Sequence, residues 1–340
     1  MSQEPAMFAT GRSTKSPETV PRRPAAPVKS APTPHRRTSL AGDLIRLARP
    51  GQWPKNLLVS PLAFLDATVW TAAAGWRMLV TVATFTVASV MVYVVNDIFD
   101  RHRDREHPAK RSRPIASGRI SVPFAWGLAI GLAALLCALL ALSSPVSWWP
   151  VLTYLAINAA YNWRIRHVAV LDAFAVAAGF VLRLVAGYIA VDVMVSGWLL
   201  VCVLSLCLMM TFGKRRNELA VAGNGHRPAL RGYSPVLVDQ LILFTAVVTV
   251  AAFLMYVHNA VPAGAYEQVL LILSALFALI GVFRYLQLVT VHSAGGDPVG
   301  MVRDRVILGA STLWAIAWGV ALVAGDQHRA WIDALLHRTG

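Results

Sequence analysis

The sequence predicts an all-α membrane protein in which nine transmembrane helices form a bundle around a central cavity. Of the 340 residues, 56% are hydrophobic and only 14% are charged, whereas soluble domains carry about a quarter charged residues. The hydrophobic residues fall into separate blocks of roughly 18–25 residues, the length that a helix needs to cross a bilayer. Such blocks favour a multi-pass membrane protein over a soluble domain with one core.

Residues 1–39 differ in composition from the rest of the chain. They are rich in Pro, Ser, Thr, Ala and Arg, and they lack the apolar stretch of a signal peptide. We expect a disordered basic tail on the cytoplasmic side, with contact to anionic lipid as an open alternative. A membrane domain is then expected over residues 40–325, followed by a short C-terminal tail over residues 326–340.

The hydrophobic blocks place the nine spans in chain order, after an amphipathic stretch that begins at Leu40. The spans are expected at about residues 54–73, 78–99, 122–142, 147–163, 168–191, 197–213, 236–257, 267–290 and 306–324. The fourth is short, but aromatic residues at its ends, among them Trp148 and Trp163, match the aromatic belt of a membrane interface. We therefore count it as a span.

The basic residues in the loops indicate the orientation. The loop at 100–121 holds seven Lys or Arg and the loop at 213–235 holds five, whereas the loops of the opposite side hold Arg77 alone. Because excess Lys and Arg mark the cytoplasmic side, we expect a cytoplasmic N-terminus, in the inner membrane of a cell. The same pattern explains the net charge of +14 without a nucleic-acid partner, since the sequence shows no basic surface interleaved with aromatic residues of the kind that a nucleic-acid groove needs.

An acidic motif at the cytoplasmic end of the second span is the strongest candidate for a chemical site. In the string VVNDIFDRHRD, Asp100 lies three or four residues from Asn96, Asp97 and Asp104, so all four can face one direction on a helix. Three neighbouring carboxylates repel each other unless a cation lies between them. Oxygen ligands beside a phosphate suit Mg²⁺, with these four residues as its ligands. The alternative is a solvated acidic helix end that pairs with nearby arginines.

Basic and polar residues near the cytoplasmic side are candidates for binding phosphate groups, because Arg offers two parallel hydrogen bonds and Lys a point charge. A mid-span charge such as that of Arg183 is costly unless it is paired or used. The alternatives are a membrane anchor for the loop residues, an interfacial lysine at position 55 and a belt tyrosine at position 161. The candidates are Lys55, Asn56, Asn96, Lys110, Arg111, Arg113, Tyr161, Arg166, Arg183 and Lys214.

Several strings resemble the UbiA superfamily of intramembrane prenyltransferases. NDIFDRHRD followed by HPAKRSRPIASGRIS is similar to the acidic motif of that superfamily and to the basic loop behind it. One branch, the decaprenyl-phosphate phosphoribosyltransferases, is resembled by RPGQWPKNLLV, YNWRIRHVAVLDAFAVAAGFVLRLVAG, FGKRRNEL and GGDPVGMVRDRV. The resemblance runs from about residue 45 to residue 310, and its first motif is specific for the superfamily.

Two departures from the family pattern bear on the substrate. A second acidic motif, often DxxxD, is usual on a later helix, but here Asp172 is followed four positions on by Val176. Without that pair, the chain is less well equipped to hold a prenyl diphosphate between two metal clusters. Arg166 stands where the branch usually has Lys, which keeps the charge but changes the contact geometry.

The branch resemblance implies transfer of phosphoribose from phosphoribosyl diphosphate to a polyprenyl phosphate, with decaprenyl as the implied chain. Asp97, Asp100, Asp104 and Asp172 would be the catalytic residues, and Mg²⁺ on the first three would neutralise the diphosphate leaving group. The product would lead towards a lipid-linked arabinose donor for the cell envelope or a secreted glycolipid. Two alternatives stay open: a prenyltransferase of the same fold with an aromatic or tetrapyrrole acceptor, and a transporter with a cation site.

Overall fold

The computed structural model of the chain describes residues 39–57, 71–107, 110–222, 228–260, 267–291 and 304–336. Every regular element in these ranges is a helix, which confirms the predicted all-α class. The expected tail lies outside these ranges except for its last residue, and so does most of the first expected span, 54–73.

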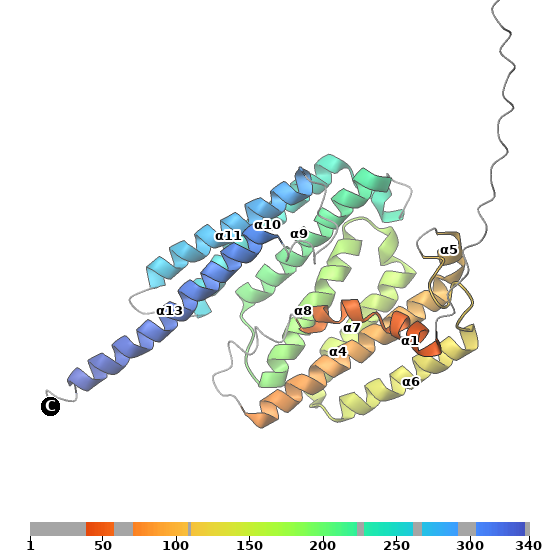
Figure 1. Cartoon of the computed structure of the whole chain (residues 1–340), viewed down its shortest axis with the longest axis horizontal. Coiled ribbons are helices and arrows are strands. Elements are labelled where there is room, and N and C mark those ends of the chain that lie inside the picture. Colours follow the sequence, from red (N-terminus) through yellow and green to blue (C-terminus); the bar gives the residue numbers. More distant parts are fainter. Residues whose placement is uncertain are drawn as a thin grey trace, which may run out of the picture. The chain divides into compact units, whose positions relative to one another are not determined.

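The long helices follow the hydrophobic blocks of the sequence (Figure 1). In chain order they are α4 (Ala72–Phe99), α6 (Val122–Ala141), α7 (Trp148–Trp163), α8 (Leu171–Val191), α9 (Gly197–Ala222), α10 (Pro235–Ala260), α11 (Glu267–Thr290) and α13 (Arg305–Leu336). Shorter helices lie at their ends: α1 (Leu40–Ala48), η1 (Pro50–Gln52), α2 (Pro54–Leu57), α5 (Arg101–Glu106), η2 (Pro145–Ser147), η3 (Ile165–His167) and η5 (Pro228–Gly232). Eight of the nine expected spans therefore correspond to described helices.

Six of these helices, α4, α6, α8, α9, α10 and α11, are long and apolar enough to cross a membrane. The helix α7 has only 16 residues, and the apolar part of α13, Arg305–Val320, is also short. Two helices run past their expected ends. The helix α9 continues beyond residue 213 to Ala222 because good helix formers follow the apolar block, and α13 continues to Leu336, past the expected boundary at residue 325.

Contacts between helices divide them into two neighbouring groups (Figure 1). The helix α4 contacts α6, α7 and α8, while α10 contacts α9 and α11, and α11 contacts α13. The groups are joined where α8 packs against α9. Ion pairs connect the end of α4 to the residues before α8, and the start of α8 to the end of α9. These connections bring distant polar segments together at one end of the helices.

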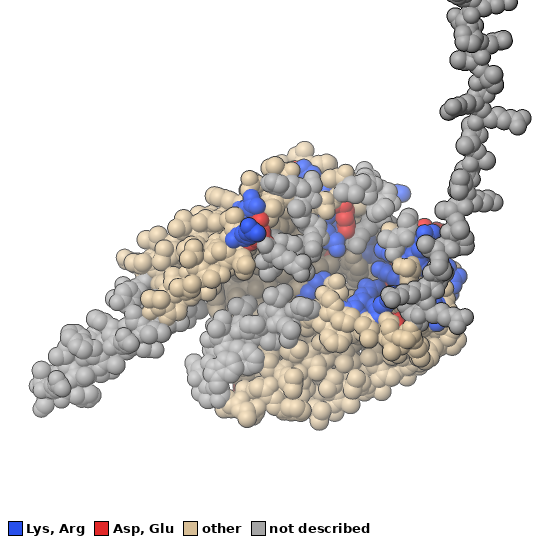
Figure 2. Space-filling model, in the orientation of Figure 1, with Lys and Arg blue, Asp and Glu red and all other residues tan. Residues whose placement is uncertain are grey.

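The surface of the molecule separates charged from apolar residues. Figure 2 shows Lys, Arg, Asp and Glu gathered in part of the displayed face, while the surface along the helices beside it consists almost entirely of other residues. Large apolar side chains such as Ile130 on α6, Phe244 on α10 and Ile272 on α11 are exposed. Helix faces of this kind are stable against lipid rather than water.

The start of α13 is held to α11 by a carboxylate. The Oδ1 atom of Asp304 accepts hydrogen bonds from the backbone N–H groups of Val306 and Ile307 at 3.0 and 3.2 Å. Arg284 of α11 forms an ion pair with Asp304 Oδ2 at 2.8 Å. The hydrogen bond from Arg284 and those from the backbone lower the pKa of Asp304 to about 2. The carboxylate is thus ionised at neutral pH and fixes where α13 begins.

The helices α9 and α11 touch at Gly213, where no larger side chain fits. A Cβ atom at this position would lie 2.0 Å from Tyr285 Oη and 3.3 Å from Val289 Cγ2. The Tyr285 hydroxyl donates a hydrogen bond to the carbonyl oxygen of Met209 at 3.2 Å, so the ring cannot move away without losing that bond. The glycine therefore sets the contact between these two helices.

Gly213→Ala is expected to lower the free energy of unfolding by about 1–3 kcal/mol, the usual cost of overpacking. Thermal unfolding of the purified protein in detergent measures this loss. Gly131→Ala on α6 is the matched control, since a Cβ there meets no atom within 4 Å. Adding Tyr285→Phe to Gly213→Ala should recover part of the loss. Equal melting temperatures for the two glycine variants would contradict the proposed contact.

Candidate active site

The acidic motif lies at the junction of α4 and α5, and the structure divides it into two pairs. Asp97 is in the last turn of α4, Asp100 lies between the helices and Asp104 is in α5. Asp97 and Asp104 are seven residues apart, which is close to two helical turns, so their side chains point in nearly the same direction. Asn96 and Asp100 are rotated away from them around the helix.

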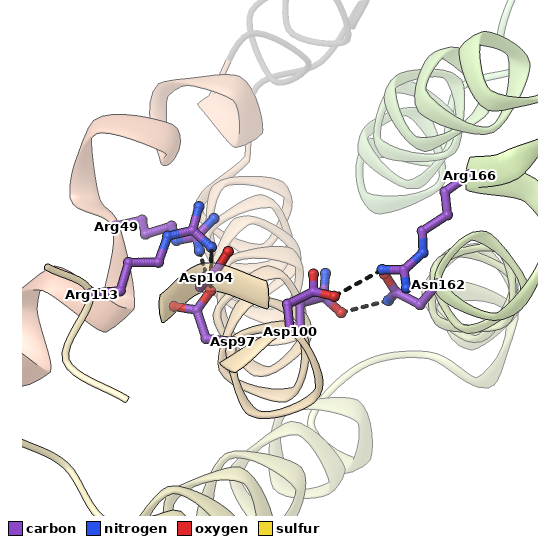
Figure 3. Close-up of polar contacts among 8 residues, drawn as sticks. Arg49, Asp97, Asp100, Asp104, Arg113, Asn162 and Arg166 are labelled. Atoms are coloured by element: carbon purple, nitrogen blue, oxygen red, sulfur yellow. Dashed lines mark hydrogen bonds and ion pairs between the residues drawn. The ribbon is translucent and has the colours of Figure 1, made fainter. Parts of the chain in front are cut away.

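Asp97 and Asp104 face the arginines of two loops (Figure 3). Arg113 Nη1 lies 3.0 Å from Asp97 Oδ1 and 2.7 Å from Asp104 Oδ2. Arg49, which caps α1 in the left-handed conformation at φ 50°, forms a second ion pair with Asp97. Both carboxylates are only 4% exposed. Two buried negative charges are thus neutralised by guanidinium groups from opposite sides of the sequence motif.

Asn96 and Asp100 face the other way, towards the end of α7 and η3 (Figure 3). Arg166 Nη1 lies 3.0 Å from Asp100 Oδ1, and the side-chain amide of Asn162 donates a hydrogen bond to Asn96 Oδ1. This arrangement corrects the expectation that all four motif residues face one direction. The physical reasons are that the neighbours Asn96 and Asp97 point about 100° apart on α4, and that α4 ends at Phe99, so Asp104 belongs to the separate helix α5.

The acidic motif offers carboxylate oxygen atoms, which are ligands that Mg²⁺ prefers. Among the described residues, no three His, Cys, Asp or Glu side chains converge on one point. Mg²⁺, however, is usually held by one or two carboxylates together with substrate phosphates. The Nη1 atom of Arg113 lies within 3.0 Å of an oxygen atom from both Asp97 and Asp104, which is where a bridging cation would be bound. These two carboxylates fit a metal ion if the guanidinium moves to a phosphate.

Arg183 is buried in the middle of α8 with only neutral partners. Its guanidinium donates hydrogen bonds to Asn56 Oδ1 at 2.7 Å, Ser89 Oγ at 3.0 Å and the Tyr154 hydroxyl at 3.2 Å. A fourth hydrogen bond goes to the carbonyl oxygen of Gly179. The guanidinium also lies over the Tyr154 ring, 4.6 Å from its centroid. Hydrogen bonds hold this cation, but no carboxylate neutralises it among the described residues.

Lys55 lies near two other cations. Lys55 on α2 is within electrostatic reach of both Lys214 on α9 and Arg183. Asn56, the neighbour of Lys55, supplies one of the hydrogen-bond acceptors of Arg183. Segments from three distant parts of the sequence therefore bring three cations together, which we call the cation cluster (Lys55, Arg183 and Lys214). Such a cluster can attract an anion such as a phosphate group.

Asp172 at the start of α8 has protein partners on both carboxylate oxygens. Arg215 Nε donates to Oδ2 at 2.9 Å, and the Tyr233 hydroxyl donates to Oδ1 at 2.8 Å. Arg215 also pairs with Glu218 at 2.8 Å. Asp172 is 1% exposed, so its surroundings are those of a buried structural ion pair. The predicted role of Asp172 in catalysis therefore gains no direct support from the geometry.

The remaining predicted residues lie outside these clusters. Lys110 and the exposed Arg111 lie in the turn before Arg113, and among the described residues neither forms an ion pair with the three motif carboxylates. Tyr161 on α7 is partly exposed and within electrostatic reach of Arg215. Their roles in substrate binding stay predictions.

Sequence reasoning missed four residues that the structure places in these clusters: Arg49, Tyr154, Asn162 and Tyr233. A sequence pattern could have indicated two of them, Tyr154 and Asn162. Tyr154, Asn158 and Asn162 recur at a spacing of four on the short, apolar helix α7, so they form a polar stripe on one face. Arg49 and Tyr233 act across long sequence separations, which no local pattern reveals.

A cavity of 340 Å³ lies among α9, α10, α11 and α13. Its lining includes Met209, Phe253, Gly281, Tyr285 and Trp314. The polar groups in the lining have partners inside the protein, since the Tyr285 hydroxyl bonds the Met209 carbonyl and two indole N–H groups bond Ser274. The cavity therefore offers a largely apolar surface to an occupant.

The two buried arginines are expected to respond differently to the same substitution. Arg215→Met leaves the buried Asp172 carboxylate without its cation, which costs about 3–5 kcal/mol of stability. Arg183→Met removes a cation that has no carboxylate partner among the described residues, so only its hydrogen bonds are lost and we expect a smaller cost of about 1–3 kcal/mol. Thermal unfolding of both variants in detergent tests this contrast, and an equal loss of stability in both would contradict it.

Comparison with known proteins agrees with the fold and the motifs. The sequence profile of the UbiA prenyltransferase family matches residues 57–299. A decaprenyl-phosphate phosphoribosyltransferase of Mycobacterium tuberculosis is 30% identical over 84% of this chain and 96% of its own length. One of Mycolicibacterium smegmatis is 37% identical over 61% of this chain and 67% of its own length.

Solved structures show the same fold. A UbiA homologue from Archaeoglobus fulgidus bound to DMAPP and Mg²⁺ matches with a TM-score of 0.62 and 21% identity, over 83% of this chain and 99% of its own. The family match, the relatives and the arrangement of apolar helices agree. The chain is a multi-pass membrane protein that belongs to the UbiA prenyltransferase family.

Proposed function

We propose that this protein transfers phosphoribose from phosphoribosyl diphosphate to a polyprenyl phosphate, giving a lipid-linked phosphoribose and diphosphate. The observation that carries the proposal is the presence of two adjoining polar clusters, one of carboxylates with arginines and one of cations. A transfer between two phosphate-bearing substrates requires binding sites for both. The relatives named decaprenyl-phosphate phosphoribosyltransferase support the same reaction.

The first cluster is suited to the diphosphate of the donor. Asp97 and Asp104 would hold Mg²⁺, while Arg49 and Arg113 would turn from these carboxylates to phosphate oxygens. The metal ion supplies positive charge that makes diphosphate a better leaving group. Asp100, on the other side of the helix, would keep Arg166 oriented, and Arg166 would then be close enough to contact the donor.

The cation cluster is suited to the phosphate of the lipid acceptor. Lys55, Arg183 and Lys214 would hold an acceptor oxygen near the anomeric carbon of the donor, where positive charge develops as diphosphate leaves. The acceptor oxygen is already an anion, so no general base has to remove a proton. Positioning and charge stabilisation by these side chains therefore account for the catalysis.

The site is proposed to face the cytoplasm of a cell, with the chain in the inner membrane. The basic segment 100–121 carries Arg113, and the basic end of α9 carries Lys214. Excess Lys and Arg in loops is typical of the cytoplasmic side. A water-soluble sugar diphosphate would reach the site from that side.

A prenyltransferase with an aromatic acceptor is the nearest alternative, and one observation weighs against it. Binding of a prenyl diphosphate in this family is expected to use a second acidic pair. In this chain, Asp172 is occupied by Arg215 and Tyr233, and Val176 lies four positions further on. A second metal cluster would therefore lack free carboxylates on α8.

The decisive experiment uses radiolabelled phosphoribosyl diphosphate. The purified protein, given this donor, Mg²⁺ and decaprenyl phosphate, is expected to form a labelled product that extracts into organic solvent. Excess chelator should stop the reaction and added Mg²⁺ should restore it. Absence of this product, together with turnover of a prenyl diphosphate and an aromatic acid, would favour the alternative.

Asp97→Asn is expected to lower the rate of this reaction by at least about 100-fold, because the charge that would hold the metal ion is lost. The same assay measures the effect. Asp192→Asn is the matched control, since Asp192 caps the far end of α8 and asparagine tolerates its left-handed conformation at φ 61°. Wild-type turnover in Asp97→Asn would contradict the proposed role.

The apolar cavity is proposed to hold part of the polyprenyl chain. Met209 in its lining is five residues from Lys214, or about 8 Å along α9. A lipid phosphate at the cation cluster could therefore place its first isoprene units in the cavity.

Gly281→Leu should fill this space, because a Cβ at Gly281 meets no atom within 4 Å. We expect the KM for decaprenyl phosphate to rise about tenfold, as burial of a few methyl groups is lost, with the KM for the donor unchanged. Kinetics with both substrates varied in turn measure this difference. Gly131→Leu on α6 is the control, and an equal KM for the acceptor in both variants would argue against the cavity.

A further inference from the structure

The chain makes a strained turn at Val170, directly before α8. Val170 has φ 70° and ψ −52°, and the N–H group of Leu171 bonds the carbonyl oxygen of Ala169 at 2.9 Å. This is the γ-turn with positive φ at its centre, which is rare and strained. A β-branched residue makes the conformation still less favourable. Such strain persists only where the surrounding structure enforces it.

Tyr233 and its neighbours enforce the turn. The hydroxyl oxygen of Tyr233 accepts a hydrogen bond from the Val170 N–H group at 2.7 Å and donates one to Asp172 Oδ1 at 2.8 Å. Arg215 Nε holds the other oxygen of Asp172 at 2.9 Å. Burial and the hydrogen bond to Asp172 raise the pKa of the Tyr233 phenol, so the hydroxyl keeps its proton and can make both bonds.

The segment η5 also presses on the turn through Gly232. A Cβ atom on Gly232 would lie 2.6 Å from the Cβ of Ala169. Two consecutive residues, Gly232 and Tyr233, therefore contact two consecutive residues of the turn. Gly232 packs against Ala169, and Tyr233 accepts a hydrogen bond from Val170, so both contacts hold the turn.

The turn follows the short helix η3, which carries Arg166. Only three residues separate Arg166 from Val170, and Arg166 Nη1 lies 3.0 Å from Asp100 Oδ1. A change of φ at Val170 would redirect this short segment relative to α8. We propose that Tyr233 is a positioning residue for the active site, whose hydroxyl holds Val170 in its strained conformation and thereby holds Arg166 beside Asp100.

This inference rests on the proposed function for its kinetic test. Tyr233→Phe removes both hydrogen bonds of the hydroxyl and leaves the ring. We expect the KM for phosphoribosyl diphosphate to rise about tenfold to 100-fold, since small misplacements of a binding group have effects of this size. The KM for polyprenyl phosphate should change much less, because Arg183 is held by hydrogen bonds to Asn56, Ser89 and Tyr154, which lie away from the turn.

Val170→Gly separates positioning from a general loss of stability. Glycine adopts positive φ without strain, so the double variant Tyr233→Phe, Val170→Gly should regain most of the affinity for the donor. Thr245→Val is the matched control, since it removes the hydrogen bond of another buried hydroxyl group, on α10 and outside the proposed site. If Tyr233→Phe does not fold, Gly232→Ala displaces Ala169 with the hydroxyl intact and should raise the same KM.

A binding assay distinguishes failure of this inference from failure of the proposed function. Titration of the protein with Mg²⁺ and inorganic diphosphate measures the site without the sugar. Weaker diphosphate binding in Tyr233→Phe that Val170→Gly restores supports the positioning role, even if phosphoribosyl diphosphate proves not to be the donor. Equal binding in the wild type and Tyr233→Phe, or no recovery in the double variant, would overturn it.

Discussion

The structure of the polar end of this protein depends on the neutralisation of charges that its helices take out of water. A carboxylate at the end of a membrane helix is costly unless a cation lies beside it. Asp97 and Asp104 share Arg113, and Asp172 has Arg215. These pairs connect the end of α4 to the following loop, and the start of α8 to the end of α9. Charge pairing thus arranges the site as well as stabilising it.

The same pairing fits the binding of a metal diphosphate that we propose for this site. A guanidinium that bridges two carboxylates can exchange partners with an incoming ligand: the cation of the ligand goes to the carboxylates, and the arginine goes to phosphate oxygens. Each charge keeps an opposite charge as neighbour throughout this exchange. The partly exposed side chains of Arg49 and Arg113, 28% and 29% accessible, leave room for such a movement, whereas Arg215, at 3%, is fixed in place.

The sequence was sufficient to predict most of the helices and to suggest a candidate site, but not the contacts among the residues of that site. Apolar blocks predict helices well because the length needed to cross a bilayer is a strong constraint, and eight expected spans correspond to observed helices. The spacing of Asp97, Asp100 and Asp104 indicated a candidate site but was too coarse to separate the two pairs. The pairing of Asp172 with Tyr233 joins residues 61 positions apart, and the turn at Val170 uses a residue type that disfavours it. Neither follows from local patterns.

The two charged side chains of α8, Asp172 and Arg183, have different surroundings, which suit different roles. Asp172 at its start is bonded by Arg215 and Tyr233, and we propose that this end of the helix positions the segment with Arg166. Arg183 lies 11 residues, or about 16 Å, further along the helix, and its partners are neutral. Among the described residues no carboxylate neutralises this cation, so it can attract an anion that enters with a lipid chain. In the proposed function, the soluble diphosphate would instead be bound by a metal ion on the acidic motif and by Arg49 and Arg113. The carboxylates at the end of α4 are paired with arginines, whereas Arg183 in the middle of α8 has neutral partners. This difference suits two phosphate-bearing substrates, one that arrives from water and one that arrives from the lipid.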